Sequence, residues 1–291
     1  MAAAYNLELE QLDVKTAYLN GTLEETIYMA PPKGIRSSPD EIWLLQHALY
    51  GLKQSGKVWN DLIDKTLQNL GFKPSSGDLC VYIYNKDGTM ILMPLYVDDS
   101  LCAHNNPPIF HHIISELNQH FEMSYLGPAH FMLRIKITQD QKEGTVMLNQ
   151  CQYITDMLDQ YGMSNCHTCP TPMNPKLELT TEQSPQSDTK HTEVKSIPYQ
   201  NVTGSLLYAA MATRPDIAFA VRVLCQFNSN YGTTHWTAAK QVMHYLKGTT
   251  DLSIIYHQDA EKSLEGTLSG IYDPEEIEGF TDTDWAGDIE T

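Results

Sequence analysis

The sequence lacks long apolar runs, an opening signal segment and any excess of basic residues. No apolar stretch approaches the roughly 18–20 residues of a membrane span, and no charged-then-apolar segment opens the chain. The formal net charge is −17, from 36 acidic and 19 basic side chains, which argues against nucleic-acid binding through bulk electrostatics. We therefore expect a soluble, cytoplasmic protein without a membrane partner.

Cysteine is also scarce and carries no disulfide pattern. The six cysteines are scattered, mostly within apolar runs, which favours reduced thiols over a disulfide framework. Cys166 and Cys169, with His167 between them, resemble half of a zinc site, but no second close pair follows at the spacing of a zinc finger. Zinc is therefore the minor interpretation of this segment.

What the chain does have is a pair of adjacent carboxylates between two apolar stretches. Asp98 and Asp99 follow the apolar residues 90–97 and precede the apolar residues 101–103, a pattern that predicts a strand, a turn and a second strand. Two carboxylates this close raise each other's pKa unless a cation lies between them, and Mg²⁺ prefers such ligands together with phosphates. The simpler alternative is a polar turn without function.

Periodicity predicts an α+β chain with an antiparallel sheet in its first half. Strands are predicted at 7–12, 26–29, 79–84, 90–97, 131–138, 145–148, 252–256, 264–272 and 278–281; helices at 58–70, 107–121, 153–161, 199–211, 215–228 and 233–247; and a linker at about 164–197.

Several ordered motifs together resemble one protein family. The segments Leu-Asp-Val-Lys-Thr-Ala-Tyr18 and Tyr-Val-Asp-Asp99 are similar to the two metal-binding segments of reverse transcriptases. Across nearly its whole length the chain resembles the reverse transcriptase of copia-type retrotransposons, as a fragment of a Pol polyprotein cut at both ends. The matching segments are residues 11–21, 27–29, 49–54, 59, 95–99, 204–208, 213–217, 245–249 and 284–288.

The resemblance implies a right-hand polymerase with four parts. These are a palm (an antiparallel sheet with helices on one face) with residual fingers at 1–138, a thumb-like segment and linker at 139–197, a helical connection region at 198–250, and the start of a ribonuclease H-like domain at 251–291. Asp282 aligns with the first metal carboxylate of that last domain. Its other acidic ligands would follow residue 291, so we expect no ribonuclease H activity.

The resemblance also implies a catalytic site. Asp13, Asp98 and Asp99 would hold two Mg²⁺ ions, with Mn²⁺ as an alternative, for transfer of a nucleotide from a deoxynucleoside triphosphate to a primer 3′-hydroxyl. The partners would be an RNA or DNA template with its primer, and other parts of the Pol polyprotein. The location would then be the cytoplasm, a virus-like particle or the nucleus.

Further residues receive roles by the same resemblance. Tyr18 would lie under the incoming sugar and exclude a 2′-hydroxyl, although the residue alone is equally typical of a core tyrosine. Gln54, Lys57 and Tyr96 would contact the nucleotide. Lys57 and Lys53 are equally typical of a solvated helix start.

Residues 131–137 occupy the place of the primer grip. Arg134 and Lys136 are the candidate contacts, and Arg134 stands where relatives usually have glycine. Arg214 and Asp216 are expected to be structural.

Some departures from the family pattern weaken the prediction of activity. Only twelve residues precede Asp13, so the fingers segment and its basic clamp are expected to be missing. Gly56 replaces a usual proline, and Pro94 would delete a ladder hydrogen bond unless its strand bulges or lies at an edge. The alternatives to a polymerase are an inactive transposon remnant that keeps the palm fold as a scaffold, and a two-Mg²⁺ nuclease.

Overall fold

The computed structural model describes residues 1–35, 38, 40–187 and 194–258. The chain divides into two compact units, Met1–Ala129 and His130–Thr291, and each has its own hydrophobic core. None of the helices within the described residues is long and apolar enough to cross a membrane.

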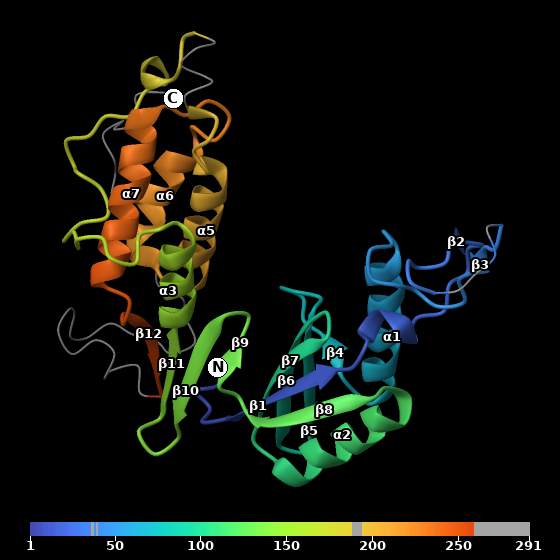
Figure 1. The fold of residues 1–291 in the computed structure, drawn as a ribbon. Helices are drawn as coiled ribbons and strands as arrows, with labels where there is room; N and C mark the ends of the chain where they lie inside the picture. The colour runs from blue at the N-terminus through green and yellow to red at the C-terminus, as the bar shows by residue number, and fades with distance from the viewer. Residues whose placement is uncertain (36–37, 39, 188–193, 259–291) are drawn as a thin grey trace. The chain divides into compact units, whose positions relative to one another are not determined.

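The first unit is built on a six-stranded antiparallel sheet in the order β4-β5-β6-β7-β1-β8 (Figure 1). Its elements are, in chain order, β1 (Glu8–Val14), the 3₁₀ helix η1 (Ala17–Asn20), β2 (Tyr28–Met29), β3 (Trp43–Leu44), α1 (Ser55–Asn69), β4 (Lys73–Pro74), β5 (Val81–Lys86), β6 (Thr89–Tyr96), β7 (Asp99–His104), α2 (Pro107–His120) and β8 (Met123–Pro128). Strands β2 and β3 form a separate two-stranded sheet.

Alternation along β1 gives the large sheet two different faces. Leu12 and Val14 belong to the core that the sheet shares with α1 and α2, whereas Gln11 and Asp13 between them are half-buried on the other face. Trp59 of α1 packs edge-on against Phe121, just after α2, with ring centroids 5.2 Å apart. Both helices therefore cover one face, and the opposite face carries Asp13.

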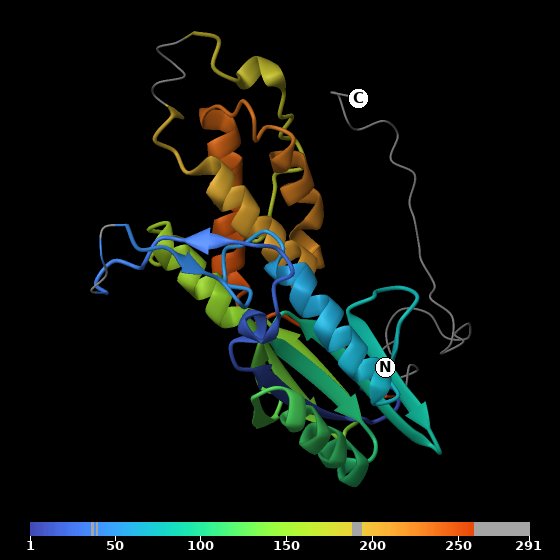
Figure 2. The ribbon, with the colours of Figure 1, turned by 90° about the vertical axis from the view of Figure 1, so that its right-hand side faces the viewer.

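The second unit combines a helical core with a smaller antiparallel sheet, both labelled in Figure 1, and its gold-to-orange helices are also visible in Figure 2. Its elements are β9 (Phe131–Met132), β10 (Ile135–Asp140), β11 (Thr145–Asn149), α3 (Cys151–Gln160), the 3₁₀ helix η2 (Thr181–Gln183), α5 (Tyr199–Ala212), the 3₁₀ helix η3 (Pro215–Ile217), α6 (Ala218–Cys225), α7 (Thr233–Gly248) and β12 (Ser253–His257). The sheet order is β12-β11-β10-β9, and helices α3, α5, α6 and α7 share one apolar core.

Buried Arg214, which precedes η3, links this part of the helical core to Thr249 at the end of α7. The Arg214 guanidinium is 1% exposed and donates two hydrogen bonds to the Asp216 carboxylate, at 2.9 and 2.7 Å. It also donates to the carbonyl and the hydroxyl of Thr249, at 2.8 and 2.6 Å, while the Tyr245 hydroxyl donates to Asp216 at 2.8 Å. The two sequence segments 213–217 and 245–249 thus form one polar network, and the structural role expected for Arg214 and Asp216 agrees with it.

The prediction of a mixed chain with antiparallel sheets is confirmed, but the strands β3, β4 and β8 were missed. β8 pairs with β1 over residues 123–128, and its glycine and proline hide the alternation by which a strand is recognised. The strand predicted at 131–138 is divided between β9 and β10, which belong to the sheet of the second unit. The strands predicted at 264–272 and 278–281, together with Asp282, lie outside the described residues.

Pro94 lies inside β6, between β5 and β7, and the strand continues through it. The pairing of β6 with β7 is interrupted at this point: Leu92 faces Ala103 and Leu95 faces Ser100, with no paired positions between them. The Ser100 hydroxyl donates to the Pro94 carbonyl at 3.0 Å. A local gap in the ladder therefore accommodates the missing N–H of proline.

Candidate functional site

Two of the three predicted catalytic aspartates face each other across neighbouring strands. Asp13 near the end of β1 is paired with Asp99 at the start of β7, so both side chains leave the same face of the sheet. Asp98 precedes Asp99 in the turn, and its carbonyl accepts a hydrogen bond from the Val14 N–H at 2.8 Å. All three aspartates are half-buried. The strand–turn–strand arrangement predicted around Asp98 and Asp99 is confirmed.

The turn that carries Asp98 is held in an unfavourable backbone conformation. Val97 has a φ of 58°, in the left-handed region that β-branched residues rarely adopt. Its carbonyl accepts a hydrogen bond from the Trp59 indole N–H at 2.7 Å, and Trp59 is anchored in the core. Helix α1 therefore fixes the turn. Strain of this kind is typical of functional sites.

Burial and repulsion between carboxylates both act on Asp13, and burial has the larger effect on its pKa. Burial raises the pKa of Asp13, and the neighbouring charges of Asp98 and Asp99 raise it further, while Lys15 acts weakly in the opposite direction. Among the described residues, three possible metal ligands lie within 4.8 Å of one another at Glu8, Glu10 and His104. The three aspartates do not form such a group. The backbone thus brings Asp13, Asp98 and Asp99 together, but their carboxylates are not drawn into one tight cluster.

A second tyrosine, Tyr50, lies near both Tyr18 and Asp98, and the sequence analysis did not assign it to the site. The Tyr18 ring, in η1, lies 4.5 Å from the Tyr50 ring. Burial and the neighbouring Asp98 charge raise the pKa of Tyr50. Tyr50 falls within the segment 49–54 that carries the family resemblance, and this was the available signal.

The other predicted nucleotide contacts lie at the ends of nearby elements. Gln54 precedes the first residue of α1 and is half-buried, while Lys57, in the first turn of that helix, is exposed. A Cβ atom built on Gly56 would lie 3.9 Å from the Tyr18 hydroxyl, which is ordinary contact, so the start of α1 borders Tyr18. Tyr96, the last residue of β6, is 58% exposed.

The predicted primer-grip residues belong to the second unit. Leu133 and Arg134 form the turn between β9 and β10, and both have left-handed backbone angles, with φ of 49° and 59°. Glycine is the residue that adopts such angles without strain. The exposed Arg134 side chain lies 3.4 Å from Asp156, and Lys136 on β10 is exposed.

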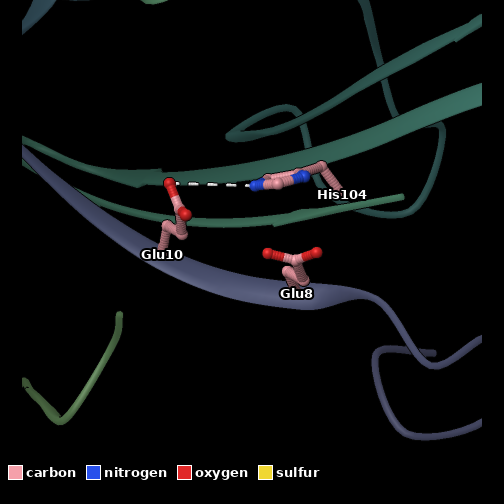
Figure 3. Close-up of side chains that lie close together, drawn as sticks. All are labelled: Glu8, Glu10 and His104. Atoms are coloured by element: carbon pink, nitrogen blue, oxygen red, sulfur yellow. Dashed lines mark ion pairs between the residues drawn. The ribbon is translucent and has the colours of Figure 1, made fainter. Parts of the chain in front are cut away.

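The tight ligand group of the described residues consists of Glu8, Glu10 and His104 (Figure 3). Glu8 and Glu10 share one face of β1, and His104 ends β7 opposite Glu8. Sequence reasoning missed this group; the acidic alternation at the start of β1 was the available signal. The cysteine pair that resembles half of a zinc site, for which zinc was the minor interpretation, is half-buried, and Cys166 and Cys169 do not enter such a group.

Comparison with known proteins identifies the family. Residues 1–175 match the family described as reverse transcriptase (RNA-dependent DNA polymerase). This chain belongs to the reverse transcriptase family. The matched residues include Asp13, Asp98 and Asp99, in agreement with the resemblance seen in the sequence.

Curated relatives are transposon proteins. The chain is 35% identical over its full length to the retrovirus-related Pol polyprotein from transposon TNT 1-94 of Nicotiana tabacum, of which it covers 21%. It is 33% identical over 96% of its length to the corresponding polyprotein from transposon RE1 of Arabidopsis thaliana, covering 18% of that protein. It is 31% identical over 87% of its length to the putative transposon Ty5-1 protein of Saccharomyces cerevisiae, covering 80%. The chain thus corresponds to a reverse transcriptase segment of a Pol polyprotein and spans about a fifth of the two plant polyproteins.

Proposed function

We propose that this chain catalyses RNA-directed DNA synthesis, with Asp13, Asp98 and Asp99 as the ligands of two divalent metal ions. Mg²⁺ is the preferred ion. The observation that carries the proposal is the pairing of Asp13 with Asp99 next to the turn that holds Asp98. The donor set fits the metal because carboxylate oxygens are the ligands Mg²⁺ prefers. Burial and then repulsion from Asp98 and Asp99 raise the pKa of Asp13, and a bound cation would offset both effects. Bound there, the metal would activate the primer hydroxyl and offset charge on the phosphates.

The protein's own part is to hold and orient these groups. Trp59 and Val14 fix the two ends of the turn, so the carboxylates of Asp98 and Asp99 are presented from a rigid backbone. Tyr50 lies near Asp98 and against Tyr18, which limits the positions of the Tyr18 ring. Tyr18 is the proposed surface under the sugar of the incoming nucleotide. Gln54, Lys57 and Tyr96 are the proposed polar contacts around it.

The larger assignment follows the family. Residues 1–138 are the proposed palm, 139–197 the thumb-like segment and linker, 198–250 the connection region, and 251–291 the start of a ribonuclease H-like domain. Arg134 and Lys136 are proposed to contact the primer. Template, primer, deoxynucleotides and the remaining Pol segments are the proposed partners.

Primer extension on an RNA template tests the central proposal. With Mg²⁺ and deoxynucleotides the purified chain is expected to extend a primer, and Asp98→Asn is expected to lower the rate by at least about a thousandfold, since the site acts through its fixed charges. Asp61→Asn, an exposed aspartate of α1, is the matched control and should extend the primer normally. No extension by the parent chain would favour an inactive remnant. Template loss without nucleotides would favour a nuclease.

A second assay isolates Tyr18. Replacing Tyr18 with valine removes the ring that would meet a 2′-hydroxyl, so incorporation of ribonucleotides is expected to rise relative to deoxynucleotides by about tenfold or more. Tyr28→Val, at an exposed tyrosine of β2, is the control. Equal discrimination in the parent and the Tyr18→Val variant would remove Tyr18 from the nucleotide site.

A further inference from the structure

A second acidic group lies on the same two strands as the proposed catalytic aspartates, but on the opposite face. Glu8 and Glu10 precede Leu12 and Val14 on the face of β1 that packs against the helices, whereas Asp13 points the other way. His104 is the cross-strand partner of Glu8, and Asp99 is the partner of Asp13. Five residues separate Glu8 from Asp13 along the strand, about 16 Å at 3.3 Å per residue.

Two members of this group are buried without adequate hydrogen bonds. His104 is 0% exposed and Glu10 is 8% exposed, and their closest atoms, His104 Nε2 and Glu10 Oε2, are 3.8 Å apart. Both ring nitrogens of His104 and Oε2 of Glu10 lack a hydrogen-bond partner. A buried polar group without a hydrogen bond lowers the stability of the fold by about 1–3 kcal/mol. Three such atoms close together therefore indicate that a ligand binds there.

The surroundings hold these side chains in position and leave a route from solvent. The His104 ring stacks on Phe110 of α2 at 4.1 Å, which fixes its plane, and Figure 3 shows its nitrogens in line with the Glu10 carboxylate and above Glu8. Burial and the nearby Glu10 carboxylate raise the pKa of Tyr125 of β8. Tyr125 is 47% exposed, and Glu8 is only half-buried, so the rim of the group is open.

We propose that Glu8, Glu10 and His104 bind one divalent transition-metal ion, most favourably Zn²⁺. One ligand atom from each residue lies within 4.8 Å of the other two, as a shared ion requires. An imidazole nitrogen with two carboxylates is a donor set for zinc and its first-row neighbours, whereas Mg²⁺ and Ca²⁺ prefer oxygen ligands alone. Three protein ligands leave a fourth position for water.

Such an ion would join β1 to β7 at the end away from Asp13 and Asp99. Because both strands carry proposed catalytic carboxylates on their other face, the ion would stabilise the backbone that positions them. This is a structural role, and it does not depend on the proposed polymerase activity.

Titration of the purified chain with Co²⁺, followed by its visible absorption, tests the site without any activity assay. We expect one equivalent to produce the intense bands of low-coordinate cobalt and to be displaced by Zn²⁺. Glu10→Gln and Glu8→Gln are expected to weaken binding by at least about tenfold, the smallest loss usual for disturbing such a site. Because Glu8 is half-buried at the rim, Glu8→Gln should fold even if Glu10→Gln does not.

Two control variants locate the bound ion. Asp98→Asn removes a proposed catalytic ligand, and Cys166→Ser removes half of the cysteine pair; both are expected to bind Co²⁺ as tightly as the parent chain. The proposal is overturned if the parent chain gives no bands, if Glu8→Gln binds unchanged, or if either control variant loses the ion. A near-ultraviolet thiolate band that disappears in Cys166→Ser would assign the ion to the cysteines instead.

Discussion

The two units treat buried charge in opposite ways. In the second unit the Arg214 guanidinium is enclosed and makes four hydrogen bonds to Asp216 and Thr249. In the first unit Glu10 and His104 are equally enclosed but approach each other only to 3.8 Å. A buried polar group whose atoms are all hydrogen-bonded stabilises the fold. A buried polar group whose atoms lack hydrogen-bond partners indicates a missing ligand.

The proposed catalytic aspartates are an intermediate case. They are only half-buried, and the charges of Asp98 and Asp99 help to raise the pKa of Asp13. Water can still reach them, so the repulsion is tolerated without a fixed partner. A site that must admit substrate and metal needs this accessibility, and a structural network such as that of Arg214 does not.

Removal of Arg214 should have the largest effect on stability. Arg214→Met leaves the Asp216 carboxylate and the Thr249 carbonyl without their main donor, and breaking a buried pair in this way costs about 3–5 kcal/mol. The loss should appear in urea unfolding, and hydrogen exchange should locate it in α5, α6 and α7 of the second unit. Arg222→Met, at an exposed arginine of α6, is the matched control and should change stability by less than about 0.5 kcal/mol. Equal effects of the two variants would contradict a special role for the network.

Neutralising Asp216 should have a smaller, pH-dependent effect. Burial opposes ionisation of this carboxyl, but hydrogen bonds from Arg214 and Tyr245 outweigh burial and lower the pKa of Asp216 below its ordinary 3.8. Because the folded pKa lies below the unfolded one, the stabilisation is complete above the unfolded pKa and is lost as the pH falls through the folded pKa.

Asp216→Asn should therefore destabilise the chain by about 2 kcal/mol at pH 7, the range for hydrogen bonds to charged groups. The difference from the parent chain should shrink as the pH falls below 3.8. Unfolding curves measured at several pH values provide the check, with Asp251→Asn as the control. A difference that stays constant with pH would show that the carboxylate charge is not the source of the effect.

Local patterns in the sequence predicted most elements of the fold, because amphipathic helices and alternating strands depend on residues close in sequence. The same patterns could not place β8, since a glycine and a proline interrupt it, nor assign β10 to a second sheet, since strand partners are chosen by long-range packing. Asp13, Asp98 and Asp99 were found through family motifs. Their pairing across β1 and β7 is a register that spacing alone does not define.

The missed residues have a common physical reason. Tyr50 reaches Asp98 from a loop far away in sequence, and His104 meets Glu8 and Glu10 only through the pairing of two strands. No periodicity connects such positions. The contrast with Arg214 is informative, because Arg214 and Asp216 are close enough in sequence for their turn to be predicted, whereas the Thr249 and Tyr245 contacts were not.

Replacing the unsatisfied pair by apolar residues should raise stability, which is the reverse of the result expected at Arg214. The double substitution Glu10→Leu with His104→Leu removes three unpaired buried atoms from a face that already packs Leu12 and Phe110. Such replacements are often stabilising, here by about 1–2 kcal/mol when a metal chelator is present. Urea unfolding with and without added Zn²⁺ is the measurement. A double variant less stable than the chelated parent chain would show that the pair is already satisfied.

The exposed pair of Arg134 and Asp156 completes the comparison and should have the smallest effect. Its atoms are 3.4 Å apart in solvent, and such pairs contribute only about 0–1 kcal/mol. Arg134 also has a φ of 59°, where a non-glycine residue is strained by about 1 kcal/mol or more. Arg134→Gly should therefore raise stability slightly, by about 0.5–1 kcal/mol, because relief of strain outweighs the lost pair. Asp156→Asn removes the pair but keeps the strained turn, so it should change stability by less than about 0.5 kcal/mol. If Arg134→Gly instead destabilised the chain as strongly as Arg214→Met, solvent exposure would not explain why the two arginine–aspartate pairs differ in their contribution to stability.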